Sequence, residues 1–250
     1  MNLNNESIEN LQLVYNKIYN NALELILDGE LLLENKRLAR AYLCFQIAIE
    51  ELGKLPMINT VAIKKHNREK IDWKELNRRL RSHKKKNSMA DVMRRSFYTA
   101  VLMEKSYEPK LEISIHALKM AFKNYKEELK KNPQILLNQQ VSSLFSFTEP
   151  SIERLKEDIE LRNNKKNLSL YSDFNGKDFV SPNEYIEETD VKEIMVDAYF
   201  QQLVIEMSEI HINGFILFNK KGVLEEGTKL ESFTMKNIMW LEKQREKDNK

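Results

Sequence analysis

One arginine and one histidine in the most basic part of the chain have the side-chain chemistry for cleaving RNA without a metal ion. Arg78 and His83 are separated by four residues in the run NRRLRSHKKK, residues 77–86. A neutral imidazole can take the proton of a ribose 2′-hydroxyl, while a guanidinium holds the phosphate and stabilises its developing charge. Histidine suits the role of general base because it changes charge near neutral pH. Arg78 and His83 are therefore the candidate catalytic residues.

The same run supplies cations for the backbone of an RNA strand. Positive side chains around the candidate pair can neutralise phosphates without reading the base sequence. An Arg-x4-His spacing also arises by chance in a chain of this composition, so the charge around it carries the hypothesis. The candidate RNA-binding residues are Arg79, Arg81, Lys84, Lys85 and Lys86.

The charge of the chain is unevenly distributed. Between Lys64 and Arg95 there are 13 basic and 4 acidic residues, a net charge of +9, in a chain whose formal net charge is only +2. A basic segment on an otherwise acidic protein is typical of a phosphate-binding surface. The alternative is an ordinary solvated loop and helix face, and charge alone does not separate the two interpretations.

A second group of charged residues, EELGK at residues 50–54, follows the apolar part of a predicted helix. Glu50 and Lys54 are one helical turn apart, in the order that favours an ion pair, so we expect them to face each other. Gly53 costs about 1 kcal/mol relative to alanine inside a helix, which predicts a close approach by another part of the chain. From the spacing alone, a structural role is favoured over a catalytic one.

The sequence contains no motif for a nucleotide, a cofactor or a metal. Its six glycines do not form a phosphate-binding loop or a dinucleotide fingerprint. His116 and His211 lack the glutamate three residues earlier that marks a di-iron helical bundle. The single cysteine, Cys44, lies in the apolar face of a predicted helix, where a buried structural thiol is expected. We therefore predict no metal site and no cofactor.

Two long helices at the start of the chain are expected to position these residues. Apolar side chains recur at three- and four-residue steps over residues 8–32 and 38–55, with a break at Asn35 between the two runs. Pro56 predicts a kink or an end of the second helix. Because the connection at Asn35 is short, the two helices must pack antiparallel.

Further helices follow, and few turn residues interrupt them. Asp72 and Trp73 predict the entry to a third helix, and residues 166–183 are predicted to be a loop with a short extended piece. The other expected helices lie near residues 89–105, 110–131, 150–163, 190–210 and 228–246. Six glycines and five prolines are too few for a sandwich, a barrel or a doubly wound sheet. The predicted fold is an all-α bundle of six to eight helices.

The sequence gives no sign of export or membrane insertion. The segment MNLNNESIEN lacks the basic region and the apolar run of a signal peptide. No apolar stretch approaches the length of about 18 residues that a membrane-spanning helix needs. We therefore expect a cytoplasmic protein that does not bind a membrane.

Four segments together resemble one family of bacterial defence proteins. They are NALEL at residues 21–25, AIEELGK at 48–54, RSHKKK at 81–86, and LYSDF at 170–174 with Pro182 beyond it. On these segments the chain resembles the AbiV family of abortive-infection (anti-phage) proteins, which belongs to the HEPN superfamily.

The resemblance implies a HEPN-like helical bundle with additional C-terminal helices. Residues 1–135 would form the core that carries the Arg-x4-His segment, and residues 136–250 would form a helical extension packed on that core. HEPN proteins are commonly homodimers whose Arg-x4–6-His pairs meet at the interface, which would place Arg78 and His83 there. In this arrangement the residues expected to order the site are Glu50, Glu51 and Lys54.

Three functions are compatible with these expectations. The first is an abortive-infection toxin that arrests translation by metal-independent RNA cleavage and is switched on by a phage-encoded activator. The second is a non-catalytic effector that binds RNA, the ribosome or a phage protein. Arg79 favours this alternative, because HEPN motifs usually follow the arginine with Asn, Asp or His. The third is a purely structural dimer.

Overall fold

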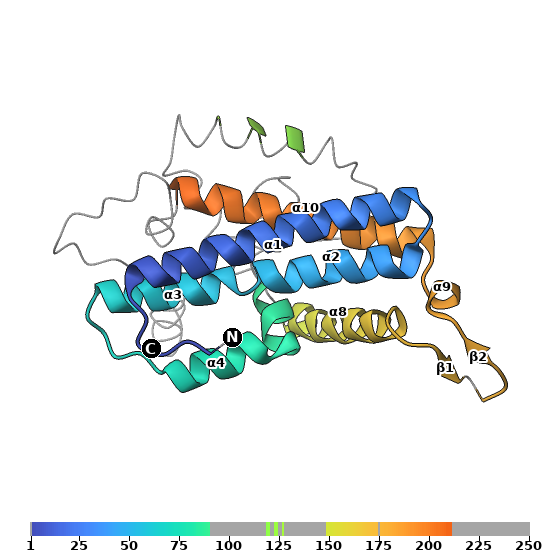
Figure 1. Cartoon of the computed structure of the whole chain (residues 1–250), viewed down its shortest axis with the longest axis horizontal. Helices are drawn as coiled ribbons and strands as arrows, with labels where there is room; N and C mark the ends of the chain where they lie inside the picture. Colours follow the sequence, from blue (N-terminus) through green and yellow to red (C-terminus); the bar gives the residue numbers. More distant parts are fainter. Residues whose placement is uncertain are drawn as a thin grey trace.

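The first two helices form an antiparallel pair on which other parts of the molecule pack (Figure 1). The computed structural model describes residues 2–90, 119–120, 123–124, 127, 149–174 and 176–211. Helix α1 covers Ile8–Glu34 and helix α2 covers Leu38–Leu52, where the apolar periodicity predicts them. The antiparallel packing of the two helices is also confirmed.

Backbone and side-chain hydrogen bonds fix both ends of α1. The hydroxyl of Ser7 accepts a hydrogen bond from the backbone N–H of Asn10 at 3.1 Å. At the other end Lys36 adopts a positive φ of 55°. The backbone N–H of Arg37 donates to the carbonyl of Leu32 at 2.8 Å. The chain therefore reverses within a few residues and enters α2 alongside α1.

A new helix begins almost immediately after α2 ends. Helix α3 covers Leu55–His66 and has Pro56 in its first turn, where the missing proline N–H has no intrahelical partner to lose. The break predicted at Pro56 is confirmed. The helix that follows it directly has no counterpart among the predicted elements, because proline can begin a helix as well as end one.

Helix α4 carries the first part of the basic segment. It covers Trp73–Arg81 and begins at Asp72, whose carboxylate accepts a hydrogen bond from the backbone N–H of Glu75 at 2.9 Å. The predicted helix entry at Asp72 is thus confirmed, although it opens the fourth helix of the chain and not the third. Ser82 then interrupts the helical path, and residues 83–90 are helical again.

The later part of the chain contributes two long helices separated by a small hairpin. Helix α8 covers Glu149–Leu168, α9 covers Pro182–Tyr185 and α10 covers Glu188–His211. Helices α8 and α10 match the helices predicted near residues 150–163 and 190–210, and α8 continues farther than predicted. Helix α10 packs against both α1 and α2, and α8 packs against α2.

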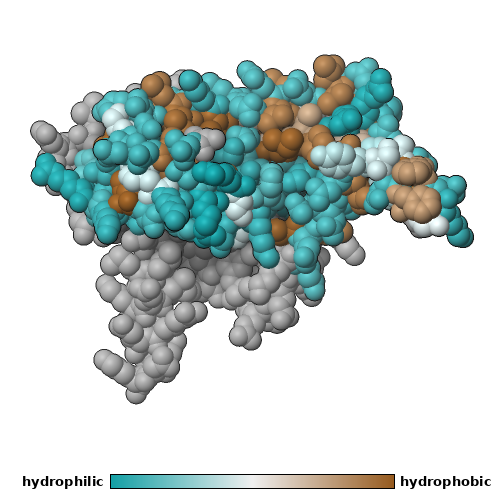
Figure 2. Space-filling model, turned by 60° about the horizontal axis from the view of Figure 1, so that its bottom comes forward, coloured by the Kyte–Doolittle hydropathy of each residue, from teal (hydrophilic) through white to brown (hydrophobic). Residues whose placement is uncertain are grey.

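The hairpin between α8 and α9 consists of β1, Asp173–Phe174, and β2, Phe179–Val180, which pair antiparallel. Phe174 lies opposite Phe179, their ring centroids are 5.4 Å apart, and both side chains are exposed. Gly176 takes the positive φ of 93° in the connection between the strands. The predicted extended piece is therefore confirmed as a paired hairpin, and Figure 2 shows hydrophobic residues at this end of the molecule.

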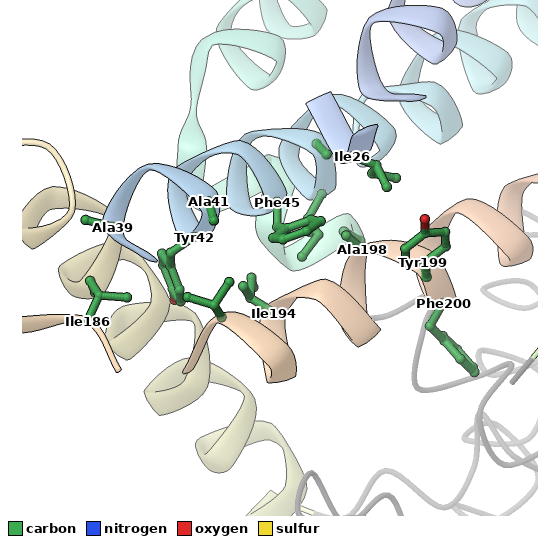
Figure 3. Close-up of a cluster of buried hydrophobic side chains, with 14 of the residues drawn as sticks. Ile26, Ala39, Ala41, Tyr42, Phe45, Ile186, Ile194, Ala198, Tyr199 and Phe200 are labelled. Carbon is green, nitrogen blue, oxygen red and sulfur yellow. The ribbon is translucent and has the colours of Figure 1, made fainter. Parts of the chain in front are cut away.

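Two apolar clusters are arranged along the length of α1. The first lies between α2, α10 and the second half of α1 and includes Tyr42, Phe45, Ile194 and Ala198. Figure 3 shows Tyr42 and Phe45 of α2 lying against Ile194 and Ala198 of α10. Phe45 and Ala198 are completely buried, so this cluster fixes α10 on the α1–α2 pair.

The second apolar cluster joins the first half of α1 to α3 and α4. It includes Leu11, Tyr15, Leu52, Leu55 and Leu80. Leu52 ends α2 and Leu55 begins α3, and both are completely buried, so the break between the two helices lies within the core. The cluster holds the basic helix α4 against the body of the molecule.

The described residues confirm the prediction of an all-α fold. They consist mainly of helices, and their strands are limited to the two-residue pairs of the hairpin. The helices predicted near residues 110–131 and 228–246, and most of the one near 89–105, lie outside the described residues apart from short helical stretches. None of the helices in the described part of the chain is both long and apolar enough to cross a membrane.

Gly29 gives a test of how closely α1 and α2 pack. A Cβ atom added to Gly29 would lie 2.8 Å from the ring of the buried Phe45. Helix propensity alone predicts that Gly29→Ala raises the free energy of unfolding by about 1 kcal/mol. We expect a decrease of about 1–3 kcal/mol instead, because the ring has to shift within a packed core. Urea unfolding of the variant measures the sign, and an increase in stability would show that the two helices are less tightly packed.

Candidate functional site

The helix at residues 83–90 crosses the end of α2 at very short range. A Cβ atom added to Gly53 would lie 2.3 Å from the carbonyl oxygen of Lys86 and 3.3 Å from the Cβ of Ala90. Gly53 has a φ of −66°, which any residue can adopt, so the requirement for glycine comes from space and not from backbone conformation. The close approach predicted at Gly53 is confirmed.

A hydrogen bond between two buried side-chain amides holds the same helix crossing, one helical turn from Glu50. The side-chain amide of Gln46 donates to the side-chain oxygen of Asn87 at 2.9 Å, and both residues are buried. Gln46 lies one turn before Glu50 on α2, and Asn87 lies one turn after His83. The crossing therefore aligns Glu50 with the start of the second helix.

The carboxylate of Glu50 binds three cationic or ionisable side chains. Nδ1 of His83 lies 2.5 Å from Oε2, and Nζ of Lys86 lies 3.0 Å from the same oxygen. The other oxygen, Oε1, accepts from Nζ of Lys166 at 3.0 Å. His83 and Lys86 come from the helix at residues 83–90, whereas Lys166 comes from α8. Three separate parts of the chain thus meet at one carboxylate.

The cluster is buried except for the imidazole. The side chain of Glu50 is 3% exposed and those of Lys86 and Lys166 are 8% exposed, whereas that of His83 is 59% exposed. Burial raises the pKa of Glu50, but the hydrogen bond with His83 and the two lysines outweigh it and lower the pKa to about 2. Glu50 is therefore ionised throughout the physiological pH range.

This geometry determines which nitrogen of His83 faces its surroundings. An ionised carboxylate only accepts hydrogen bonds, so the proton of a neutral His83 ring must lie on Nδ1 and point at Glu50. Nε2 then keeps its lone pair on an exposed side chain. A carboxylate that orients a histidine in this way prepares Nε2 to accept a proton from a bound molecule.

The candidate partner of His83 engages a different carboxylate. Nε and Nη2 of Arg78 donate to the two oxygens of Glu75, one turn earlier in α4, at 2.6 and 2.7 Å. Both side chains are exposed at 64% and 42%. The position of α4 itself is fixed by Asn77, whose buried side chain donates to the carbonyl of Leu3 and accepts from its N–H. The structure thus brings Glu50, and not Arg78, to the imidazole of His83.

The predicted RNA-binding residues divide into surface and interior positions. Arg81, Lys84 and Lys85 are exposed and Arg79 is half-buried. Lys86 is buried, with its ammonium on Glu50. It therefore orders the site from inside, whereas the other four lie where a phosphate backbone can reach them.

One expected ion pair is wrong. The spacing predicts Lys54 opposite Glu50, but Lys54 forms an ion pair with Glu51. The one-turn spacing required a helix that continues through residue 54, whereas α2 ends at Leu52 and the chain turns. Glu50 is left facing the interior, where it meets the helix at residues 83–90.

Lys166 is the part of the site that sequence reasoning missed. It contacts Glu50 across 116 residues of sequence, so no periodicity or local spacing indicates the contact. Gln46 did leave a signal, because it is a polar residue one turn before Glu50 on a buried helix face. Among the residues that the structure describes, no group of three or more His, Cys, Asp or Glu side chains is placed to hold a metal ion.

The ionisation of Glu50 predicts how stability depends on pH. Because its pKa falls from an ordinary 4.5 to about 2 on folding, ionised Glu50 stabilises the fold above pH 4.5, and this stabilisation is lost as the pH falls toward 2. We expect Glu50→Gln to lower the free energy of unfolding by about 3 kcal/mol at neutral pH, since it leaves two buried lysines unpaired. Urea unfolding from neutral to acidic pH should show this difference shrinking below pH 4.5.

The exposed carboxylate of Glu75 gives the matched control. Glu75→Gln removes a surface ion pair, which contributes little to stability, so its effect should be small at every pH. A loss in Glu50→Gln that stays constant down to pH 2 would contradict the role of the charge.

The packing at Gly53 predicts that a shift of the helix at residues 83–90 changes the environment of the His83 ring. We expect Gly53→Ala to lower the free energy of unfolding by about 1–3 kcal/mol and to move the helix at residues 83–90, since the new Cβ would overlap a backbone carbonyl. The NMR signals of the His83 ring should therefore change. Gly29→Ala is the control, because its new Cβ is also crowded, but against the ring of Phe45 and not against the helix at residues 83–90. Unchanged His83 signals in Gly53→Ala would contradict this prediction.

Comparison with known proteins identifies the family. No curated protein and no solved structure matches the chain. The family model for AbiV matches residues 10–199. The match extends from the first turn of α1 into α10 and includes all the residues of the Glu50 cluster. The chain therefore belongs to the AbiV family of abortive-infection proteins, within the HEPN superfamily.

Proposed function

We propose that this protein is a defence effector that arrests translation during phage infection by cleaving RNA without a metal ion, with His83 at the reacting atoms. The observation that carries the proposal is the exposed imidazole whose Nδ1 binds the buried, ionised Glu50. A purely structural histidine has no need of both an orienting carboxylate and an exposed ring. The net charge of +9 between Lys64 and Arg95 supports RNA as the substrate.

The reaction proceeds by attack of the RNA on its own backbone. Nε2 of His83 takes the proton of a ribose 2′-hydroxyl, and the 2′-oxygen forms a bond to the adjacent phosphorus. The bond from phosphorus to the 5′-oxygen of the next nucleotide breaks, that oxygen takes a proton from water, and the hydroxide that remains takes the proton from the imidazolium. The products are a 2′,3′-cyclic phosphate end and a 5′-hydroxyl end, and Glu50 stabilises the imidazolium that forms.

Arg78 supplies the positive charge at the phosphate after it leaves Glu75. An exposed ion pair of this kind contributes little to stability, so a phosphate can displace the carboxylate at little cost. Arg79, Arg81, Lys84 and Lys85 hold the flanking phosphates. HEPN proteins often form dimers, and we propose a homodimer in which the guanidinium reaches the phosphate from the same subunit or from the partner.

A second candidate function is arrest by binding alone. The bidentate pair of Arg78 with Glu75 favours it, because the structure holds the guanidinium on a carboxylate other than the one that His83 binds. In this case the basic surface retains RNA or the ribosome in a salt-sensitive manner. Translation then stops although the RNA remains intact.

Substitution of His83 separates the two functions. In phage-infected cells we expect the wild type to stop amino-acid incorporation and to produce 2′,3′-cyclic phosphate ends. His83→Ala should lower cleavage by a factor of about 100 or more, since it removes the general base. His66→Ala is the matched control, because His66 lies at the end of α3 and should leave cleavage unchanged.

The outcomes are distinguished by measuring incorporation and RNA ends in the same samples. Undiminished cleavage by His83→Ala would contradict the assignment of the general base. Arrest by the wild type with intact RNA would establish the binding function instead.

A further inference from the structure

The two oxygens of the Glu50 carboxylate have different partners. Oε2 faces Nδ1 of His83 and Nζ of Lys86, which belong to one helix, and Oε1 faces Nζ of Lys166, which belongs to α8. The terminal torsion of a glutamate side chain is broad and soft, so the side chain itself does not hold the carboxylate plane. A partner on the second oxygen is what prevents rotation. Lys166 is the hydrogen-bond partner of that oxygen.

Helix α8 is itself held so that Lys166 reaches inward. Arg162, one turn earlier, donates to Asp197 of α10 at 2.5 Å, and Lys165 forms an ion pair with Asp190 of the same helix. The hydroxyl of Ser169 donates to the carbonyl of Lys166 at 2.6 Å and is completely buried. Helix α8 therefore binds α10 through two cations, Arg162 and Lys165, and binds Glu50 through a third, Lys166.

The two neighbouring lysines on α8 thus have different partners and different roles. Lys165 ties α8 to α10 and does not bind Glu50, whereas Lys166 binds Glu50 with an ammonium that is 8% exposed. A buried charge-assisted hydrogen bond is weakly screened by solvent and is stronger than a neutral one. Lys86 remains on Oε2 if Lys166 is removed, so Glu50 keeps one buried cation to neutralise it.

We propose that Lys166 is a positioning residue for His83. By binding Oε1 of Glu50 it holds the carboxylate plane so that Oε2 faces Nδ1, and this keeps the proton of the neutral ring on Nδ1 and leaves Nε2 free. The site in the basic segment is therefore complete only when α8 is in place. The consequence for RNA cleavage rests on the proposed function, but the effect on the ring does not.

The test is the position of the proton on the neutral His83 ring. In protein labelled with 15N-histidine, NMR chemical shifts of the ring nitrogens report the fractions of the Nδ1–H and Nε2–H forms. The wild type should have mainly Nδ1–H at His83. Lys166→Met should raise the Nε2–H fraction severalfold, because the carboxylate plane is no longer held. Lys166→Arg should restore the wild-type spectrum, since guanidinium also donates to Oε1.

Lys165→Met is the matched control for a general disturbance of α8. It removes an ion pair from the adjacent position of the same helix, so it should leave the His83 ring in the Nδ1–H form. If Lys166→Met does not fold, as judged by circular dichroism, Lys166→Gln replaces it. A neutral amide holds the carboxylate more weakly than an ammonium, so the Nε2–H fraction should again rise.

The same variants separate this inference from the proposed function. If the wild type cleaves RNA, Lys166→Met should lower kcat by a factor of about 10–100 with little change in KM, as expected when a histidine loses its orienting partner. If the Nε2–H fraction rises in Lys166→Met but the wild type does not cleave RNA, the positioning role is supported and the proposed ribonuclease activity is contradicted. An Nδ1–H fraction that does not change in Lys166→Met, or in Lys166→Gln where that variant replaces it, would overturn the positioning role, whatever the cleavage activity.

Discussion

The burial of one ionised carboxylate is the constraint on which the arrangement of this protein depends. Glu50 lies on a helix whose other inward-facing residues are mostly apolar, and a charge there is tolerated only if cations accompany it. Lys86 and Lys166 supply them from two distant parts of the chain. The fold must therefore bring α2, α8 and the helix at residues 83–90 to one point, and any alternative packing would leave a charge unpaired.

The end of α2 has the backbone geometry that lets the helix at residues 83–90 approach Glu50. Ending the helix at Leu52 and placing a glycine next allows another helix to cross in direct contact, which a residue with a Cβ would prevent. The apolar clusters on either side keep the crossing in place, one through α10 and the other through α3 and α4. Apolar packing and ion pairing thus favour the same geometry, as a well-defined site requires.

The sequence is sufficient to predict the features that depend on a local pattern of residues. The apolar repeat gave the two first helices, Asp72 gave the start of α4, and Gly53 indicated a close approach. Glu50 and His83 were both singled out, yet their contact was not, because side-chain partners across a helix crossing have no fixed spacing. The expected pairing of Glu50 with Lys54 failed for a related reason: it assumed a helix that continues where the chain in fact turns.

The distance along the chain between Glu50 and Lys166 also has a consequence during synthesis. The two residues are separated by 116 positions, so a ribosome that adds about 5–20 residues per second needs on the order of 10 s to go from one to the other. During that interval the emerging chain carries the basic segment with one of the partners of Glu50 still missing. The protein would then acquire its finished Glu50 cluster late in its own production, after most of the chain has left the ribosome that makes it.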